Sequence, residues 1–321
     1  MELKLSTNTS LPQNTERKHA PVLILGSGPA GLSAALYAAR AELKPILLTG
    51  IELGGQAALT FTIENYPGFP EGVGGSQLGE LFQQQAERFG AQVDFGTAFS
   101  VDLSQRPFQV SVDNGFDYYA DTLILATGAS SNTLKIPGEK ELTGKGVSYC
   151  ATCDGWFFKE KNVAVVGGGD SALEEALFLT RYASSVTIIH RRDELRAGAI
   201  LQHRAAEEPK IKYIWNTIVT AVEGSGSMNG LALKNIVTNE ETSQAFDGVF
   251  IFIGHKPNSS LFVGQLEMDE KGYVIVDKNM KTSVPGVFAA GELADPDYRQ
   301  VITSAGMGSA AAIQATRFLS E

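Results

Sequence analysis

The sequence predicts an α/β protein built from two Rossmann-like domains, one of them inserted into the other. Three observations predict this fold. The chain of 321 residues is longer than the roughly 250 to 300 residues at which a single hydrophobic core stops growing. An apolar strand, a glycine-rich turn and a helix follow one another twice along the chain. Two short glycine-containing segments, near residues 128 and 254, are suited to carry the chain between domains.

The composition is that of an ordinary globular protein and excludes several classes of function. Hydrophobic residues make up 43% and charged residues 19%, which rules out a disordered or fibrous chain. The formal net charge of −10 gives no basic surface for nucleic acid or anionic membranes, and no apolar run reaches the roughly 18 residues of a membrane span. We expect a soluble, cytoplasmic protein. Residues 1–20 are polar and aperiodic, and we expect a flexible N-terminal extension there instead of a cleaved targeting peptide.

The first dinucleotide-binding pattern begins with the apolar strand at residues 22–25 (VLIL). It leads into residues 26–31 (GSGPAG) and a helix over residues 32–40. In such a turn the first glycine allows the tight bend, the second lets the backbone approach a pyrophosphate, and the third lets helix and strand pack closely. A single match is weak, because an unrelated α/β fold can carry a glycine-rich turn.

The second copy makes chance an improbable explanation. Residues 163–166 (VAVV) are followed by residues 167–172 (GGGDSA) and a helical run over residues 173–182. Two such units in one chain predict two nucleotide cofactors, or an exchange between them.

The second unit is expected to prefer NADP over NAD. A generic fingerprint places an acid about 20 residues after the first glycine, where it binds ribose hydroxyls. Here the strand at residues 186–189 is followed by His190, Arg191 and Arg192, with Arg196 close behind. Guanidinium groups pair with the 2′-phosphate that distinguishes NADP. The alternative is a solvated basic face, which the neighbouring residues 193–194 (DE) partly favour.

The first unit departs from that fingerprint and surrounds the second. Its second strand, residues 45–48, ends in Thr49 and Gly50 without an acid, and residues 54–56 (GGQ) and 64–70 (ENYPGFP) form loops that could wrap an extended ligand. We therefore predict one discontinuous domain at residues 21–128 and 256–321, closed by a helix over about residues 300–319. The other domain is residues 129–255.

Cys150 and Cys153 are the only cysteines and form a C-x-x-C motif ahead of the second unit. The spacing suits reversible dithiol and disulfide chemistry, and structural disulfides are rare inside cells. A structural zinc site needs about four ligands, which the chain does not offer at metal-ligand spacing, so we expect no metal. Inert burial is the other alternative. Asp154 could exchange protons with a departing thiolate or cap the helix that follows; the two roles are compatible.

These motifs resemble the low-molecular-weight, FAD-dependent thioredoxin reductases from residue 21 to about residue 319. The most specific pieces are residues 54–56, 64–69, 150–155 (CATCDG), 167–176, 190–192 and 298–300 (YRQ). The resemblance implies a homodimeric thioredoxin-disulfide reductase with FAD in the discontinuous domain and NADPH in the inserted one.

Electrons would then pass from NADPH through FAD and the Cys150–Cys153 disulfide to oxidised thioredoxin. By position Cys153 would face the flavin, Cys150 would attack the partner disulfide and Asp154 would supply the proton. The inserted domain would have to rotate about crossings near Gly128 and Gly254.

The resemblance also assigns the cofactor-binding positions. For FAD these are Gly26, Gly28, Pro29, Ala30, Gly31, Thr49, Gly50, Gly54, Gly55, Gln56, Asn65, Ala126, Thr127, Gly128, Gly291, Glu292, Arg299, Gln300 and Val301. For NADPH they are Gly167, Gly169, Asp170, Ser171, Ala172, His190, Arg191, Arg192 and Arg196.

Two positions depart from the family pattern. Glu292 stands where the family usually has aspartate, and we expect modestly weaker flavin retention from its longer side chain. Ser309 stands where many members have cysteine, which leaves two cysteines as the complete redox set. A ferredoxin-linked reductase or a small-dithiol oxidase on the same scaffold is the alternative enzyme, and the intact second fingerprint with its arginines argues against it. A non-catalytic nucleotide sensor would leave residues 150–154 unexplained.

Overall fold

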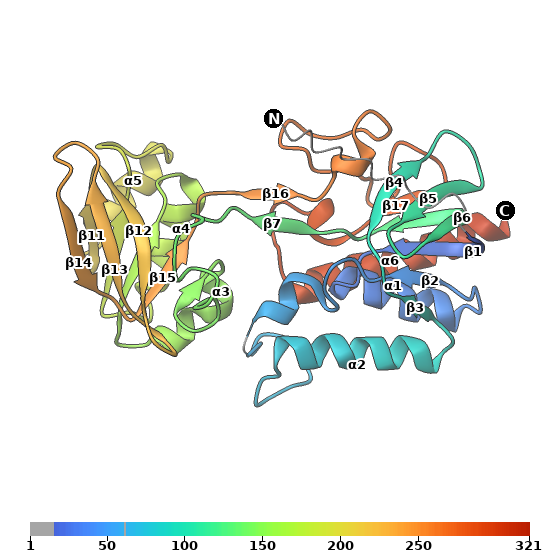
Figure 1. The fold of residues 1–321 in the computed structure, drawn as a ribbon, viewed down its shortest axis with the longest axis horizontal. Coiled ribbons are helices and arrows are strands. Elements are labelled where there is room, and N and C mark those ends of the chain that lie inside the picture. The colour runs from blue at the N-terminus through green and yellow to red at the C-terminus, as the bar shows by residue number, and fades with distance from the viewer. Residues whose placement is uncertain (1–15, 61) are drawn as a thin grey trace, which may run out of the picture. The chain divides into compact units, whose positions relative to one another are not determined.

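The computed structural model describes residues 16–60 and 62–321 (Figure 1). They form two compact units. The first contains the described chain up to Ala58, Ser76–Ala129 and Pro257–Glu321, and the second contains Leu59–Gly75 and Ser130–Lys256. Residues 1–15 of the predicted extension lie outside the described residues.

The first unit is built on a seven-stranded sheet in the order β3-β2-β1-β6-β5-β4, with β17 also paired to β6. Strands β3, β2, β1, β6 and β17 run parallel, and β5 and β4 are antiparallel additions. The strands are β1 (Glu16–Leu25), β2 (Ile46–Leu48), β3 (Gln92–Asp94), β4 (Ala98–Asp102), β5 (Phe108–Val112), β6 (Phe116–Leu125) and β17 (Val287–Ala289).

Strand β1 starts earlier than the sequence predicted. Residues 16–20, which we assigned to a flexible extension, pair with residues 116–120 of β6 in parallel register. Their polar side chains hid the strand, because this end of β1 is largely exposed and only Ala20 is fully buried. That part of the prediction was wrong.

The core of the first unit lies on both faces of its sheet. Val22 and Ile24 pack against helices on one face, while Leu23 and Leu25 belong to a second cluster on the other. The helices are α1 (Pro29–Arg40), α2 (Gly75–Arg88) and α6 (Val301–Ser320), with short turns η1 (Gly55–Leu59), η3 (Ser260–Phe262) and η4 (Gly291–Leu293).

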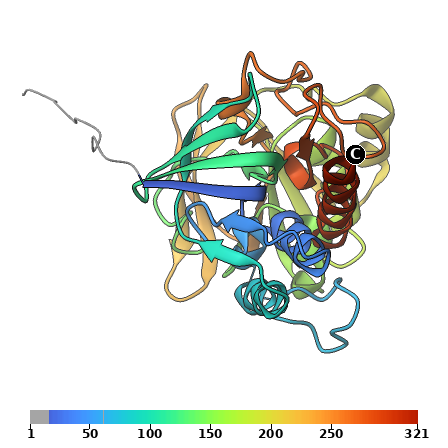
Figure 2. The same ribbon diagram turned by 90° about the vertical axis from the view of Figure 1, so that its right-hand side faces the viewer.

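Helices α1 and α6 lie side by side on the sheet face of the first unit (Figure 2). Gly308 allows this close approach, because a Cβ there would collide with the backbone carbonyl of Ala30. The predicted terminal helix is confirmed to within a residue at each end.

The second unit repeats the parallel design on a smaller scale. Its main sheet has the order β11-β10-β9-β15-β8, and a separate antiparallel sheet has the order β12-β13-β14. The strands are β8 (Val147–Ser148), β9 (Asn162–Val166), β10 (Ser185–Ile189), β11 (Ile211–Ile214), β12 (Thr217–Gly224), β13 (Met228–Asn235), β14 (Glu241–Ala245) and β15 (Gly248–Ile251). Its helices are α3 (Ala151–Asp154), α4 (Asp170–Leu179) and α5 (Ala199–Glu207), with the turn η2 (Gly155–Phe158).

Two cores flank β9. Val163 and Val165 pack with residues of α4 and α5, whereas Ala164 and Val166 join a cluster that includes Leu231 of β13. Both faces of the strand are therefore covered, as the unbroken apolar sequence indicated.

The chain passes between the units through β7 (Ala129–Ser131) and β16 (His255–Pro257), which pair as a two-stranded ribbon. Gly128 and Gly254 flank it with left-handed backbone angles, φ of 67° and 104°. The predicted α/β class with Rossmann-type parallel sheets is confirmed. None of the helices within residues 16–60 and 62–321 has the length and hydrophobicity that a membrane crossing requires.

Candidate active site

Cys150 and Cys153 are joined in a disulfide across the single turn of α3, with their Cα atoms 5.3 Å apart. Strand β8 delivers the chain to this point, since its parallel pairing with β15 fixes Val147 and Ser148 in the sheet. The N–H of Cys153 donates to the Sγ of Cys150 at 3.2 Å. A donor at this sulfur stabilises a thiolate there once the disulfide is reduced.

Asp154 lies at the end of α3 and points to Ser148. Its Oδ2 lies 2.6 Å from the hydroxyl of Ser148, whose own side chain is buried. Burial raises the pKa of Asp154, and the hydrogen bond from Ser148 offsets part of that rise. The alternative role, capping the helical turn that follows, is not seen, because the side chain makes no capping hydrogen bond to η2.

Glu139 anchors the segment that leads to the disulfide. This buried carboxylate accepts hydrogen bonds from the backbone N–H groups of Leu134 and Lys135, at 2.8 and 2.7 Å. It also accepts one from the hydroxyl of Tyr149 at 2.8 Å, next to Cys150. Burial and Glu139 together raise the pKa of Tyr149, which stays neutral.

The second glycine turn joins β9 to α4 as predicted. Gly167 has a φ of 155°, and Ala172 is fully buried against it. At Gly169 no other group lies within 4 Å of where a Cβ would stand, so the backbone at the N-terminus of α4 faces open space. That opening fits a phosphate group held by the helix N-terminus.

The segment after β10 divides into one buried and several exposed side chains. His190 is buried with its ring against Gly168, and its Nε2 has no hydrogen-bond partner. Burial and the charges of Arg196, Arg192 and Arg191 lower its pKa, so it is neutral at pH 7. The three arginines are exposed and available to an anion.

Loop 190–198 is tied to the same glycine turn. Arg196 donates its backbone N–H to the carbonyl of Gly168 at 2.7 Å, and Asp170 accepts the N–H of Gly198 at 2.7 Å. Ser171 is exposed on the first turn of α4. The predicted nucleotide residues of the second unit therefore gather at the carboxyl ends of β9 and β10.

The first glycine turn has the same construction. A Cβ on Gly26 would collide with the carbonyl of Ala126, and one on Gly31 with the carbonyl of Gly26. Gly28 faces open space at the N-terminus of α1, with Pro29 at the first helical position. This site also has room for a phosphate.

Ser27 holds the neighbouring loop against this turn. Its hydroxyl lies 2.8 Å from the carbonyl of Thr49 and 3.1 Å from that of Glu52, and its own carbonyl accepts the N–H of Gly54. Gly50 opens to free space, and a Cβ on Gly55 would come within 3.1 Å of the Cα of Gly28. Gln56 follows on η1 and is exposed.

Two more predicted segments reach the N-terminus of α1 or the turn beside it. Gly291, with φ of 70°, leaves no room for a Cβ because Ala30 lies 2.9 Å from that point. Glu292 follows it; burial raises its pKa, although Arg299 acts in the opposite direction. Thr127 donates its hydroxyl to the carbonyl of Asn258 at 2.8 Å.

Asp295 shapes the approach to α6. This buried carboxylate accepts the backbone N–H groups of Asp297, Tyr298 and Arg299, at 3.0, 2.9 and 3.2 Å. The chain then turns through Arg299, whose φ of 51° is left-handed, and Gln300 caps α6 ahead of Val301.

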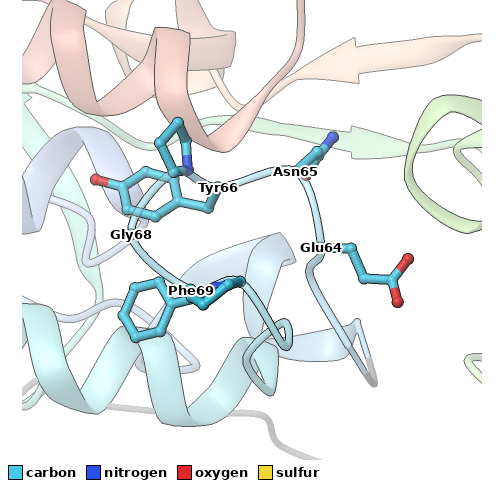
Figure 3. A pocket seen from close by; sticks show the side chains of 7 residues that line it. Glu64, Asn65, Tyr66, Gly68 and Phe69 are labelled. Carbon is cyan, nitrogen blue, oxygen red and sulfur yellow. The ribbon is translucent and has the colours of Figure 1, made fainter.

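Asn65 belongs to segment Leu59–Gly75, which the division of the chain assigns to the second unit. Residues 64–70 line an open hollow of about 320 Å³. Figure 3 shows the rings of Tyr66 and Phe69 on one side of this loop and the Glu64 carboxylate on the other; the ring centroids are 6.2 Å apart.

Sequence reasoning missed the buried polar residues that hold the site. Ser148, Glu139 and Asp295 carry no motif of their own. The sequence feature that could have indicated them is a single polar residue close to a segment predicted to be reactive.

The comparisons with known proteins agree with this geometry. A model of the pyridine nucleotide-disulphide oxidoreductase family matches residues 20–308. The chain is 50% identical to a thioredoxin reductase of Rickettsia felis, over 94% of this chain and 98% of that one. It is 52% identical to a bifunctional thioredoxin reductase/thioredoxin of Mycobacterium leprae, covering 94% of this chain and 66% of that one. A solved thioredoxin reductase from Streptococcus pyogenes superposes with a TM-score of 0.90 at 40% identity, over 94% of this chain and 98% of that one.

Proposed function

The chain belongs to the pyridine nucleotide-disulphide oxidoreductase family, and from that premise we propose that it is an NADPH-dependent thioredoxin-disulfide reductase. It takes two electrons from NADPH and delivers them through FAD and the Cys150–Cys153 disulfide to oxidised thioredoxin. One observation carries the proposal: the disulfide lies beside Asp154, a carboxyl group whose raised pKa suits proton exchange with sulfur.

NADPH is assigned to the second unit. The open backbone at Gly169 can hold its pyrophosphate, and exposed Arg191, Arg192 and Arg196 can pair with its 2′-phosphate. His190 serves as neutral packing under Gly168 and adds no charge.

FAD is assigned to the first unit. Gly28 and Gly50 open to space beside the N-terminus of α1, and Gly291 lies against Ala30 at the same helix end, with Glu292 next in sequence. The N-terminus of α6 at Gln300 supplies a second partial positive charge for a reduced flavin. Asn65 remains part of this proposal as a predicted contact.

When bound, the two cofactors together supply an electron pair to the disulfide. The chain then holds Cys150 as a thiolate, Cys153 as a thiol and Asp154 as a carboxylic acid. Cys150 Sγ attacks the disulfide of thioredoxin, the partner's S–S bond breaks, and the departing sulfur takes the proton of Asp154. Cys153 Sγ then attacks Cys150 Sγ, its own proton passing through Asp154 to the second departing sulfur. The Cys150–Cys153 disulfide is restored, and Asp154, left as a carboxylate, takes up a proton from solvent before the next thioredoxin is reduced.

Thioredoxin is the proposed acceptor because the similar proteins are named for it. The Mycobacterium leprae relative carries both names in one chain. We further propose that the protein is a homodimer, because it resembles a family of homodimeric enzymes. We also propose that it works in the cytoplasm, because its only cysteines form a redox pair and no structural disulfide.

The test follows flavin absorbance and thioredoxin reduction in the FAD-loaded protein. NADPH should bleach the flavin in the wild type, in Cys150→Ser and in Cys153→Ser, but only the wild type should reduce thioredoxin. Flavin that NADPH does not bleach would contradict the proposal. Bleaching without transfer to any thioredoxin would point to another acceptor.

A further inference from the structure

Ser148 contacts both the proposed proton carrier and the reactive cysteine. Its Oγ lies 2.6 Å from Oδ2 of Asp154, 3.1 Å from the backbone nitrogen of Cys150 and 3.2 Å from the backbone carbonyl oxygen of Cys150. The side chain is only 4% exposed, so water does not readily replace these partners.

A serine hydroxyl carries one hydrogen and two lone pairs. The N–H of Cys150 fills one lone pair. The single hydrogen can serve either Asp154 or the carbonyl of Cys150, but not both at once. The two contacts are therefore alternatives, selected by the rotation of one O–H bond.

The two alternatives match the two protonation states of Asp154. An ionised carboxylate accepts the hydroxyl hydrogen at the shorter of the two distances. A neutral carboxylic acid instead donates to the free lone pair of Ser148, and the hydroxyl turns to the carbonyl of Cys150. In either state every polar group of the set is satisfied, which a buried carboxyl requires.

We propose that Ser148 is a positioning residue that keeps Asp154 hydrogen-bonded in both protonation states, so that this carboxyl can give and regain a proton within one turnover. The inference rests on the proposed function, because Asp154 must change its protonation state during thiol exchange. The hydrogen bond from the N–H of Cys150 keeps the same hydroxyl next to α3, which carries the two cysteines.

Among the described residues 16–60 and 62–321, no charged group contributes to the pKa shift of Asp154. The titratable groups on its own turn are the thiols of Cys150 and Cys153 after reduction. Phe178 and Leu179 at the end of α4, and Tyr182 just after it, face the adjoining Gly155, and only Tyr182 among them is titratable. Burial raises the pKa of Asp154, and the hydrogen bond from Ser148 acts in the opposite direction.

A double-mutant cycle separates positioning from simple structural support. The FAD-loaded enzyme is reduced with NADPH, and its transfer to oxidised thioredoxin is followed in a single turnover. Ser148→Ala should slow transfer about tenfold, the size expected for a lost hydrogen bond to a charged group. In the Asp154→Asn background the same change should have little further effect, because asparagine does not exchange the proton.

The pH profile is the second readout. In the wild type the hydrogen bond from Ser148 stabilises the ionised form of Asp154. Ser148→Ala removes that bond, so the part of the pH–rate profile that reports the ionisation of Asp154 should move to higher pH. Ser148→Thr keeps the hydroxyl and should restore both rate and profile. Ser184→Ala, at a loop serine that bonds to Asn162, is the matched control and should change neither.

Normal flavin absorbance and NADPH-driven flavin reduction in the variants establish that they are folded. If Ser148→Ala costs as much in the Asp154→Asn background as in the wild type, or leaves the pH profile unmoved, the inference is overturned and the proposed function stays intact. A wild type that reduces its flavin but no thioredoxin overturns the proposed function, and this inference with it.

Discussion

Burial raises the pKa of Asp154, beside the disulfide, and of Glu292, which follows Gly291. They differ in what opposes that rise. At Asp154 the opposing group is a neutral hydroxyl, whereas at Glu292 it is the guanidinium of Arg299. A neutral hydroxyl adds no charge that would hold Asp154 in one protonation state, whereas the guanidinium charge at Glu292 favours its ionised form. We therefore assign proton transfer to the first group and ligand binding to the second.

Replacing Asp154 with asparagine should slow thioredoxin reduction by roughly a hundredfold, the lower range of general acid and base catalysis. The reduction of the flavin by NADPH should not change. Because burial raises the pKa of Asp154, the wild-type acid persists to higher pH than an ordinary aspartate, and its rate should fall as pH rises through that value. A hundredfold loss in both half-reactions would contradict this assignment.

Glu292→Asp should hold FAD more tightly by roughly two- to fivefold, the size of one improved hydrogen bond. The left-handed Gly291 fixes the start of this side chain beside Ala30, so its length decides where the carboxylate ends. The dissociation rate of FAD measures the effect. Unchanged or weaker FAD binding in the variant would contradict the prediction that the longer side chain of Glu292 weakens flavin retention.

At the scale of the elements, three carboxylates hold short segments in place. Glu139 fastens the approach to α3, Asp295 fastens the approach to α6, and Asp94 fastens the first half of β1. Each carboxylate accepts more than one hydrogen bond. These contacts stabilise loops that have little apolar surface to bury.

Glu139→Gln should destabilise the protein by about 2 kcal/mol, because the new amide NH₂ would face donors that now share the carboxylate. Tyr149→Phe removes only one donor and should cost about 1 kcal/mol. Urea unfolding of the full chain measures both. If both variants lose the same free energy of unfolding, the hydrogen bond from Tyr149 accounts for the stabilisation by Glu139, and the backbone contacts contribute little.

The pair of Lys18 and Asp94 should stabilise β1 in a defined pH window. The two groups are 2.8 Å apart, with side chains 29% and 15% exposed. Burial opposes ionisation of Asp94, but hydrogen bonds from Lys18, Gln92 and Tyr118 lower its pKa overall, so its contribution is lost as pH falls below about 4. The hydrogen bond to Asp94 raises the pKa of Lys18, whose contribution is lost only as pH rises past about 10.

Lys18→Met should therefore lower the free energy of unfolding by about 1 kcal/mol at pH 7 and by less at pH 3. The exposed pair of Lys234 and Glu241, 3.0 Å apart, is the control. Lys234→Met should change the unfolding midpoint little at either pH. The same difference for Lys18→Met at pH 7 and pH 3 would exclude an ionic contribution.

At the scale of the whole molecule, each unit has its own core and its own proposed nucleotide. NADP⁺ should slow amide hydrogen exchange at residues 167–172 and 190–196, and removal of FAD should speed it at residues 26–31 and 291–301. Mass spectrometry of peptides from each unit measures the two effects. Protection of residues 26–31 by NADP⁺ would reverse the cofactor assignment.

The sequence predicted the parallel strands and the helices beside them, because buried strands are continuous apolar runs and glycine turns carry a sterically required pattern. It did not predict residues 16–20 as a strand, since one exposed polar edge looks like a loop. It also did not predict Ser148, Glu139 or Asp295, because their partners are mostly backbone groups a few residues away, and only the folded turn brings those groups around the side chain. The roles assigned to the cofactor residues remain predictions.

The paired strands β7 and β16 have a consequence for the history of the gene. Both ends of the stretch Ser130–Lys256 lie in one ribbon, so the stretch enters and leaves the first unit at a single place. A single insertion between the codons for Ala129 and Pro257 is enough to add this stretch, and the Cys150–Cys153 disulfide comes with it. The parent sheet stays continuous, because its strands lie on either side of the stretch in sequence.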